Sequence, residues 1–214
     1  MQLVNPSQAF SFNYTAYDQA SNLFVAFSIY DVTTGTAVFL AKVLSTYSAF
    51  GSYMASYTSV ASKSYLVIGV VYTDNTYSTA DLTRAPTSNL YQALGGSGTL
   101  SYLCFAYSAF DQQSGLPVQA MVYNMTSGSP VSVGTAAMTY VAFGTYFGSY
   151  VGTSGNSYDV LGVVYTDGTF TVPDTSRAPS SDEFDCISLN AYYNYFTGAP
   201  TLVGQSLNAT LVES

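Results

Sequence analysis

Residues that could perform catalysis are scarce in this chain of 214 residues. It contains no histidine, so the usual general base of Ser-His and Cys-His catalysis and the commonest zinc ligand are missing. A glycosidase needs only two carboxylates, but the acidic residues are scattered over expected turns. Their one cluster, Asp182, Glu183 and Asp185, reads as a solvated edge rather than as a calcium site. We therefore expect no enzymatic activity, no cofactor and no bound metal.

Two arginines stand at matching positions in D-x-x-R-A-P segments, residues 81–86 and 174–179. Because Lys and Arg together number only 4, two basic residues at equivalent sites indicate a specific role. Each guanidinium could pair with the aspartate three residues earlier or bind loop carbonyls, and the alternative is a contact with an acidic partner. We expect a structural role for four residues, Asp81, Arg84, Asp174 and Arg177.

The elements that position these residues belong to a tandem repeat with two copies. Residues 10–93 align with residues 103–186 without a gap, at an offset of 93. The best-matched stretch is SYLVIGVVYTDNTY (64–77) against SYDVLGVVYTDGTF (157–170). A repeat of this length is near the size of a small domain, so it indicates tandem globular modules. We predict module 1 at 1–94, a Gly/Ser linker at 95–101, module 2 at 102–187 and a C-terminal arm at 188–214.

Apolar residues recur with a period of two, which is typical of β-strands with one buried face. In the strand at 64–73 one parity is the same in both copies, with Tyr65, Val67, Gly69 and Val71 in the first, so we assign it to the core. The opposite parity, which exchanges Leu66 for Asp159, is assigned to the outer face. We expect about seven strands per copy, at 9–17, 23–31, 37–45, 52–58, 64–73, 76–80 and 88–93, with counterparts 93 residues later.

The segments between these strands contain turn residues, and DVTTGT (31–36) and NMTSGS (124–129) each place a glycine where a positive φ is expected. The predicted fold is all-β: two tandem immunoglobulin-like antiparallel β-sandwiches plus a short C-terminal strand-forming arm. Because the linker LGGSGTLS is short, we expect the modules to sit end to end with limited freedom.

The two cysteines, Cys104 and Cys186, both lie in the second copy, in its first and last predicted strands. The first and last strands of a sandwich are often neighbours, so a disulfide is geometrically conceivable. The first copy has Ser11 and Ala93 at these positions and does without a bridge. The alternative to the disulfide is a pair of buried thiols.

The composition restricts the partners. The formal net charge is −8 and charged residues make up 7%, so no positive stripe can follow phosphates and we expect no nucleic-acid binding. No run approaches about 18 consecutive apolar residues, so we expect no membrane insertion. The 21 tyrosines could contact a host-surface glycan, but Trp is absent and most of these tyrosines fall on expected strands, where packing alone favours them.

The first residues, MQLVNPSQAF, lack the basic n-region and apolar h-region of a signal peptide, whereas the Lys-poor, Tyr/Ser/Thr-rich body is typical of a protein that works outside a cell. A virion component, made in host cytoplasm and released by lysis, reconciles these observations. The alternative is an extracellular or cell-surface protein from which a leader has been removed.

The series YDVTTGT, AFGSYMASYT and KSYLVIGVVYTDNTY resembles the immunoglobulin-like repeats of structural proteins of tailed bacteriophages. The resemblance covers about residues 10–93 and 103–186, and the second copy departs from it with Asn156 for Lys63 and Asp159 for Leu66. Such repeats occur on capsid decorations, head fibres and tail parts, so the resemblance implies a virion-surface location.

We therefore predict a non-enzymatic bacteriophage capsid decoration or head-fibre protein. Its partners would be other virion proteins, either the major capsid protein or neck and tail proteins, and we expect it to be homo-oligomeric or bound to an assembly. One alternative is an extracellular filament or adhesin subunit that assembles by strand addition, and a second is a glycan-binding module. The arm lacks a core of its own, so four of its aromatic residues are the candidate assembly interface, Tyr192, Tyr193, Tyr195 and Phe196.

Overall fold

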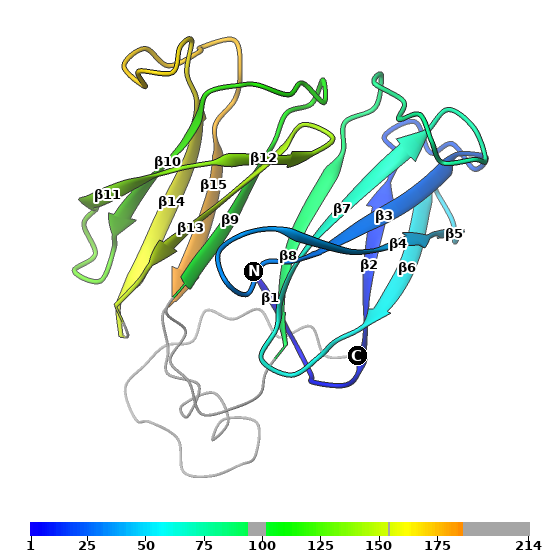
Figure 1. Ribbon diagram of the computed structural model, residues 1–214, viewed down its shortest axis with the longest axis horizontal. Coiled ribbons are helices and arrows are strands. Elements are labelled where there is room, and N and C mark those ends of the chain that lie inside the picture. Colours follow the sequence, from blue (N-terminus) through cyan, green and yellow to red (C-terminus); the bar gives the residue numbers. More distant parts are fainter. Residues whose placement is uncertain (94–101, 154, 186–214) are drawn as a thin grey trace.

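A computed structural model describes residues 1–93, 102–153 and 155–185 of the chain. These residues form an all-β protein whose antiparallel sheets pack as sandwiches, with one sandwich for each copy of the repeat (Figure 1). The described segments include no helix that is long and apolar enough to cross a membrane. The predicted linker and C-terminal arm, with Tyr192, Tyr193, Tyr195 and Phe196, lie outside the described residues.

Module 1 has two sheets. Its strands are β1 (Gln2–Val4), β2 (Ala9–Thr15), β3 (Phe24–Asp31), β4 (Val38–Leu44), β5 (Thr46–Tyr47), β6 (Ser52–Thr58), β7 (Ser64–Tyr72) and β8 (Thr87–Ala93). The larger sheet has the order β1-β8-β7-β3-β4 and the smaller sheet the order β2-β6-β5. The β1–β8 pair is parallel, and the other pairs in this module are antiparallel.

Module 2 repeats this arrangement without a counterpart of β1 in its described part. Its strands are β9 (Tyr102–Ser108), β10 (Val118–Asn124), β11 (Val131–Ala137), β12 (Thr139–Ala142), β13 (Thr145–Val151), β14 (Ser157–Val164) and β15 (Ser180–Asp185). The sheet orders are β11-β10-β14-β15 and β12-β13-β9. Each strand therefore occupies the same place as its counterpart 93 residues earlier.

Both modules have the strand order of an immunoglobulin sandwich, and a second feature of that fold supports the comparison. Tyr65 near the start of β7 accepts a hydrogen bond at its hydroxyl from the backbone N–H of Val60, at 2.7 Å. Tyr158 of β14 accepts the same bond from Thr153, at 2.8 Å. This tyrosine corner fixes the loop that leads into the central strand of the larger sheet.

Each module has its own core, which confirms the predicted core parity. Tyr65, Val67 and Val71 are buried between the two sheets of module 1. Gly69 belongs to the same face, where a Cβ atom would lie only 2.7 Å from the ring of Phe27. Module 2 has an equivalent core that includes Val160 and Val164.

A third hydrophobic cluster lies between the modules and corrects the predicted arrangement of the modules. The modules do not sit end to end: they lie side by side (Figure 1), with β7 and its neighbours packed against the smaller sheet of module 2. Leu66, Ile68 and Val70, assigned to the outer face, do point away from the core of module 1. They are nevertheless fully buried, because Cys104 and Phe147 of module 2 cover them.

The predicted strands at 76–80 and 169–173 are wrong. In each place a loop makes only an isolated bridge, Tyr72 to Ala80 and Tyr165 to Pro173. The strands β1, β5 and β12 were not predicted, because two to four residues are too few to show an alternating pattern. The two turn glycines are confirmed, since Gly35 and Gly128 have φ values of 81° and 78°.

Candidate contact surfaces

The loops that contain Arg84 and Arg177 are held by local hydrogen bonds. Asp81 Oδ1 accepts bonds from the backbone N–H of Thr83, at 3.0 Å, and from its hydroxyl, at 2.6 Å. Arg84 Nε lies 3.6 Å from Asp81 Oδ2, which is the ion pair expected from the D-x-x-R spacing. Asp174 and Arg177 repeat this pair at 3.6 Å.

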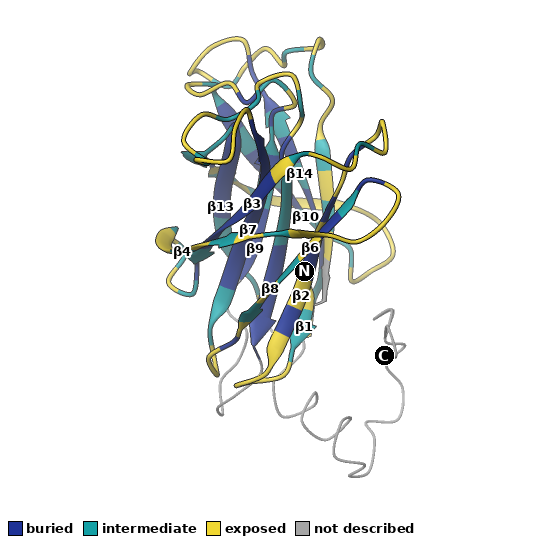
Figure 2. Cartoon of the chain, turned by 90° about the vertical axis from the view of Figure 1, so that its right-hand side faces the viewer, coloured by how far each residue is buried: buried dark blue, intermediate teal, exposed yellow. Residues whose placement is uncertain are grey.

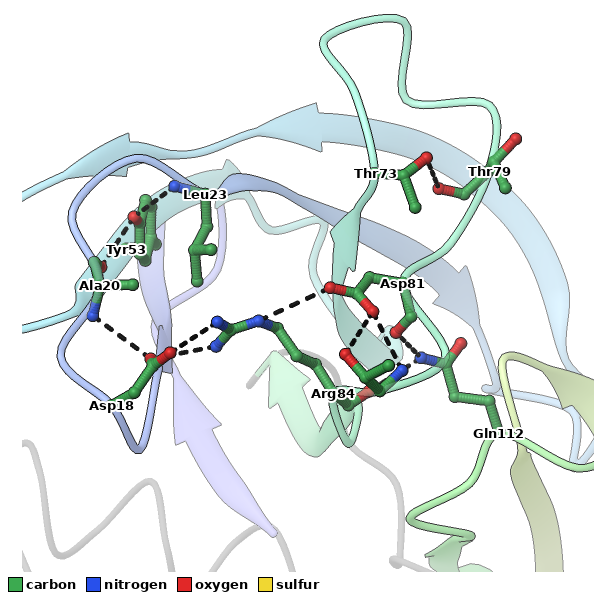
Figure 3. Close-up of polar contacts among 10 residues, drawn as sticks. Asp18, Ala20, Leu23, Tyr53, Thr73, Thr79, Asp81, Arg84 and Gln112 are labelled. Carbon is green, nitrogen blue, oxygen red and sulfur yellow. Dashed lines mark hydrogen bonds and ion pairs between the residues drawn. The ribbon is translucent and has the colours of Figure 1, made fainter.

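The stronger partner of each arginine comes from a loop 66 residues earlier in the sequence. Arg84 binds Asp18 with two parallel hydrogen bonds, Nη1 to Oδ1 at 3.0 Å and Nη2 to Oδ2 at 2.6 Å (Figure 3). Arg177 binds Asp111 in the same way, at 3.1 and 2.7 Å. The hydrogen bond from Arg84 lowers the pKa of Asp18 from 3.8 to about 2. The sequence contained one signal for this pairing, the recurrence of Asp18 as Asp111 at the same offset of 93.

The Arg84 loop is also a contact between the modules. Gln112 of module 2 donates from Nε2 to the backbone carbonyls of Asp81 and Arg84, both at 2.8 Å (Figure 3). A second polar contact joins the hydroxyls of Ser108 and Ser88, at 2.9 Å. These bonds flank the apolar cluster between the modules and fix their relative orientation. The functional alternative for Arg84, a contact with an acidic partner, thus has an internal competitor in Asp18.

Cys104 is a free thiol in this structure. Its side chain faces module 1, where Sγ lies 3.9 Å from the carbonyl oxygen of Val32. Burial raises the pKa of the Cys104 thiol to about 12. Cys186, the candidate disulfide partner, lies outside the described residues.

The acidic cluster is only partly the solvated edge that the sequence suggested. Asp182 is half-buried and burial raises the pKa of its carboxyl group, while Glu183 is exposed and the side chain of Asp185 is not described. Asp182 lines a cavity of about 220 Å³ between the modules, together with Ser88, Asn89 and Ser180. Among the described residues no group of three or more His, Cys, Asp or Glu is placed to hold a metal ion.

Several exposed apolar side chains lie on β4, at one end of the larger sheet of module 1. Val38, Phe39, Leu40 and Leu44 are 57%, 55%, 42% and 55% exposed. Figure 2 shows this strand mainly in the exposed and intermediate colours. We call these four residues the β4 patch.

The β4 patch lies on an edge strand whose protection is limited to an irregularity in its register with β3, between Ile29 and Tyr30, and one lysine. Natural edge strands are commonly blunted by charged side chains, but the single charged residue of β4, Lys42, is engaged elsewhere. Its ammonium donates to the carbonyl of Tyr77 at 2.9 Å and lies 4.7 Å from the ring centroid of Tyr72. In module 2 the equivalent strand β11 has the sequence VSVGTAA, with mostly small residues. The β4 patch is therefore a property of module 1 and not of the repeat.

Together, the fold and these contacts define a two-module β-sandwich protein whose modules share a buried interface. Comparison of the chain with protein-family models and with curated proteins gives no match. The function is therefore argued from the residues and surfaces described above.

Proposed function

We propose that the chain is a non-enzymatic structural protein that binds to the surface of a larger assembly, as a bacteriophage capsid decoration or head-fibre protein. The observation that carries this proposal is the β4 patch. Contiguous apolar side chains on an exposed strand are unusual in proteins that act alone, and they mark surfaces that another protein covers.

The shared interface supports this role because it makes the two modules one platform. Ile68 and its neighbours are buried between the larger sheet of module 1 and the smaller sheet of module 2, and Gln112 binds the Arg84 loop across the junction. A patch on such a platform loses little conformational freedom when a partner binds. The low content of charged residues, 7%, fits a surface whose contacts depend little on salt.

The location is tested on particles from cells that carry the gene. After density-gradient purification, quantitative mass spectrometry should find the chain in the particle fraction at a fixed ratio to the major capsid protein. Recovery of the chain only in the particle-free fraction would contradict the proposal.

The role of the β4 patch is tested with a double variant, Phe39→Ser with Leu40→Ser, added to particles that lack the chain. Both side chains are more than two-fifths exposed, so the fold should persist. We expect the variant to lose particle binding. The matched control is Val131→Ser with Val133→Ser in β11, which should bind like the unmodified chain. Equal binding by both variants would place the contact elsewhere.

A specific observation also favours the filament alternative. Among the residues that the structure describes, β4 pairs with β3 alone, so its other edge offers a place for an added strand. A synthetic peptide of residues 188–214 should then bind the intact chain and block its polymerisation. Absence of peptide binding would exclude this mode of assembly.

A further inference from the structure

The contact between the modules joins two different faces. Module 1 contributes the outer face of its larger sheet, which we call the acceptor face; its central residues are Leu66, Ile68, Val70 and Tyr72. Module 2 contributes the outer face of its smaller sheet and the adjoining turn, which we call the docking face; its central residues are Cys104, Phe143 and Phe147. Among the described residues, the docking face of module 1 and the acceptor face of module 2 take no part in this contact.

The free docking face of module 1 keeps the aromatic side chain that makes the contact in module 2. Phe143 has a φ of 49° and packs edge-on against Tyr72, with ring centroids 6.1 Å apart. Its counterpart Phe50 has a φ of 48° and is followed by Gly51, as Phe143 is by Gly144. The same turn therefore projects both rings, but Phe50 is 80% exposed.

The polar contact of the junction is repeated as well. Gln112, with a φ of 56°, donates across the junction to the loop of Arg84. Its counterpart Gln19 has the same φ of 56° and is exposed. The loop that would receive Gln19 is that of Arg177 in another copy of the chain, and this loop has the same ion pairs as the Arg84 loop.

The free acceptor face of module 2 keeps an apolar centre. Leu161, Val163 and Tyr165 replace Ile68, Val70 and Tyr72. The ring of Phe170 packs on Tyr165 with centroids 5.5 Å apart, as Tyr77 packs on Tyr72 at 5.6 Å. Tyr165 is itself only 7% exposed, so the ring of another docking face would pack over the same kind of aromatic pair.

Other positions of the free faces are more polar than their counterparts within the junction. On the acceptor face Asp159 stands for Leu66 and Glu183 for Leu90. On the docking face Ser11 stands for Cys104 and Met54 for Phe147. A contact between these faces therefore buries less apolar surface than the internal junction and is weaker.

From these matches we infer that the chain associates with copies of itself, the docking face of module 1 in one chain binding the acceptor face of module 2 in the next. The contact reuses the geometry of the internal junction, with Phe50 against Tyr165. Because the two faces differ, each added chain leaves one free docking face and one free acceptor face, so growth is head to tail. This association is reversible and independent of the β4 patch.

Sedimentation velocity of the full chain over a concentration series tests the inference. We expect the mean sedimentation coefficient to rise with concentration, and Phe50→Ser to abolish the rise. The control is Val60→Ser, a 56% exposed side chain in a loop outside both faces, which should behave as the unmodified chain does. A chain that stays monomeric at every concentration, or association that survives Phe50→Ser, would overturn the inference.

A second variant places a residue of the internal junction at the matching position of the free acceptor face. Asp159→Leu gives module 2 the side chain that Leu66 provides in module 1, and we expect association at concentrations about tenfold lower or less. Addition of Phe50→Ser to this variant should return the chain to monomers. Unchanged association of Asp159→Leu, or oligomers that persist in the double variant, would count against docking through these faces.

Discussion

The arginine at the end of each D-x-x-R segment joins loops that are 66 residues apart in the sequence. Its bidentate bonds to Asp18 or Asp111 use the planar geometry of the guanidinium group, which lysine lacks. The Arg84 side chain is only 13% exposed, so the carboxylates offset the cost of burying its positive charge. The pair closes one end of the sandwich, next to the loop that meets module 2.

This pairing predicts a pH-dependent contribution to stability. The pKa of Asp18 lies at about 2 in the folded protein, below its ordinary 3.8. Stabilisation by a carboxylate with a lowered pKa is complete above the ordinary value and is lost as the pH falls through the folded value. Asp18→Asn should therefore lower the thermal unfolding midpoint at neutral pH and have little effect near pH 2.

Thermal melts of both proteins between pH 7 and about pH 2 measure this convergence. Asp111→Asn is the matched variant in module 2 and should behave in the same direction, because the pKa of Asp111 is also lowered by its arginine. A difference between variant and unmodified chain that stays constant across this range would show that the ion pair is not its cause.

Cys104 gives a second prediction at the residue scale. In a Cys186→Ser variant it is the single cysteine, and its thiol is buried with a pKa of about 12. Since the thiolate is the reactive form, maleimide labelling at neutral pH should be far slower than for an exposed cysteine and complete in denaturant. Rapid labelling of the folded variant would contradict the burial of Cys104 between the modules.

At the residue scale the sequence predicted half of the arginine site. The Asp81–Arg84 pair follows from local spacing, whereas the recurrence of Asp18 as Asp111 does not by itself show their partner, because the contact depends on how the loop after β2 and the Arg84 loop meet in three dimensions. The same limit applies to the β4 patch. An apolar run such as VFLAKVL reads as an ordinary strand, and only the sheet order reveals that it lies at an edge.

Among the elements, β7 and β14 show how well strand periodicity worked and where it failed. The core parity was assigned correctly from the residues that are the same in both copies, since a strand buries every second residue against its own module. Burial of the other parity in β7 depends on the neighbouring module, which no local pattern encodes. The exchange of Leu66 for Asp159 was a sign in the sequence that the two outer faces differ.

A pair of truncations measures the burial of that second face. Ile68 is fully buried between the modules, so Ile68→Ala should lower the free energy of unfolding by about 2–4 kcal/mol. Leu161→Ala, at the matching position of module 2, should cost about 1 kcal/mol or less, because that face is not covered by another module. Denaturant unfolding at low protein concentration compares the two. Equal losses would mean that module 2 does not seal the outer face of β7.

On the scale of the whole molecule, the third hydrophobic cluster couples two sandwiches that each have their own core. We expect both modules to unfold in one calorimetric transition, with equal calorimetric and van't Hoff enthalpies. Leu66→Asp introduces the residue that module 2 itself carries at this position and should split the transition in two. Two transitions in the unmodified chain would show that the interface is too weak to couple the modules.

The polar and apolar substitutions across the two copies also bear on why the repeat is covalently fused. Consider a single module that had both the apolar acceptor face, with Leu66, and the apolar docking face, with Cys104, Phe143 and Phe147. Every molecule would present both complementary faces, so it would polymerise without limit. In the fused chain the two more apolar faces, one from each half, meet within a single polypeptide, where the covalent connection keeps their effective concentration high. The two remaining faces are more polar, so the fused chain is a stable two-module unit whose further association is weaker.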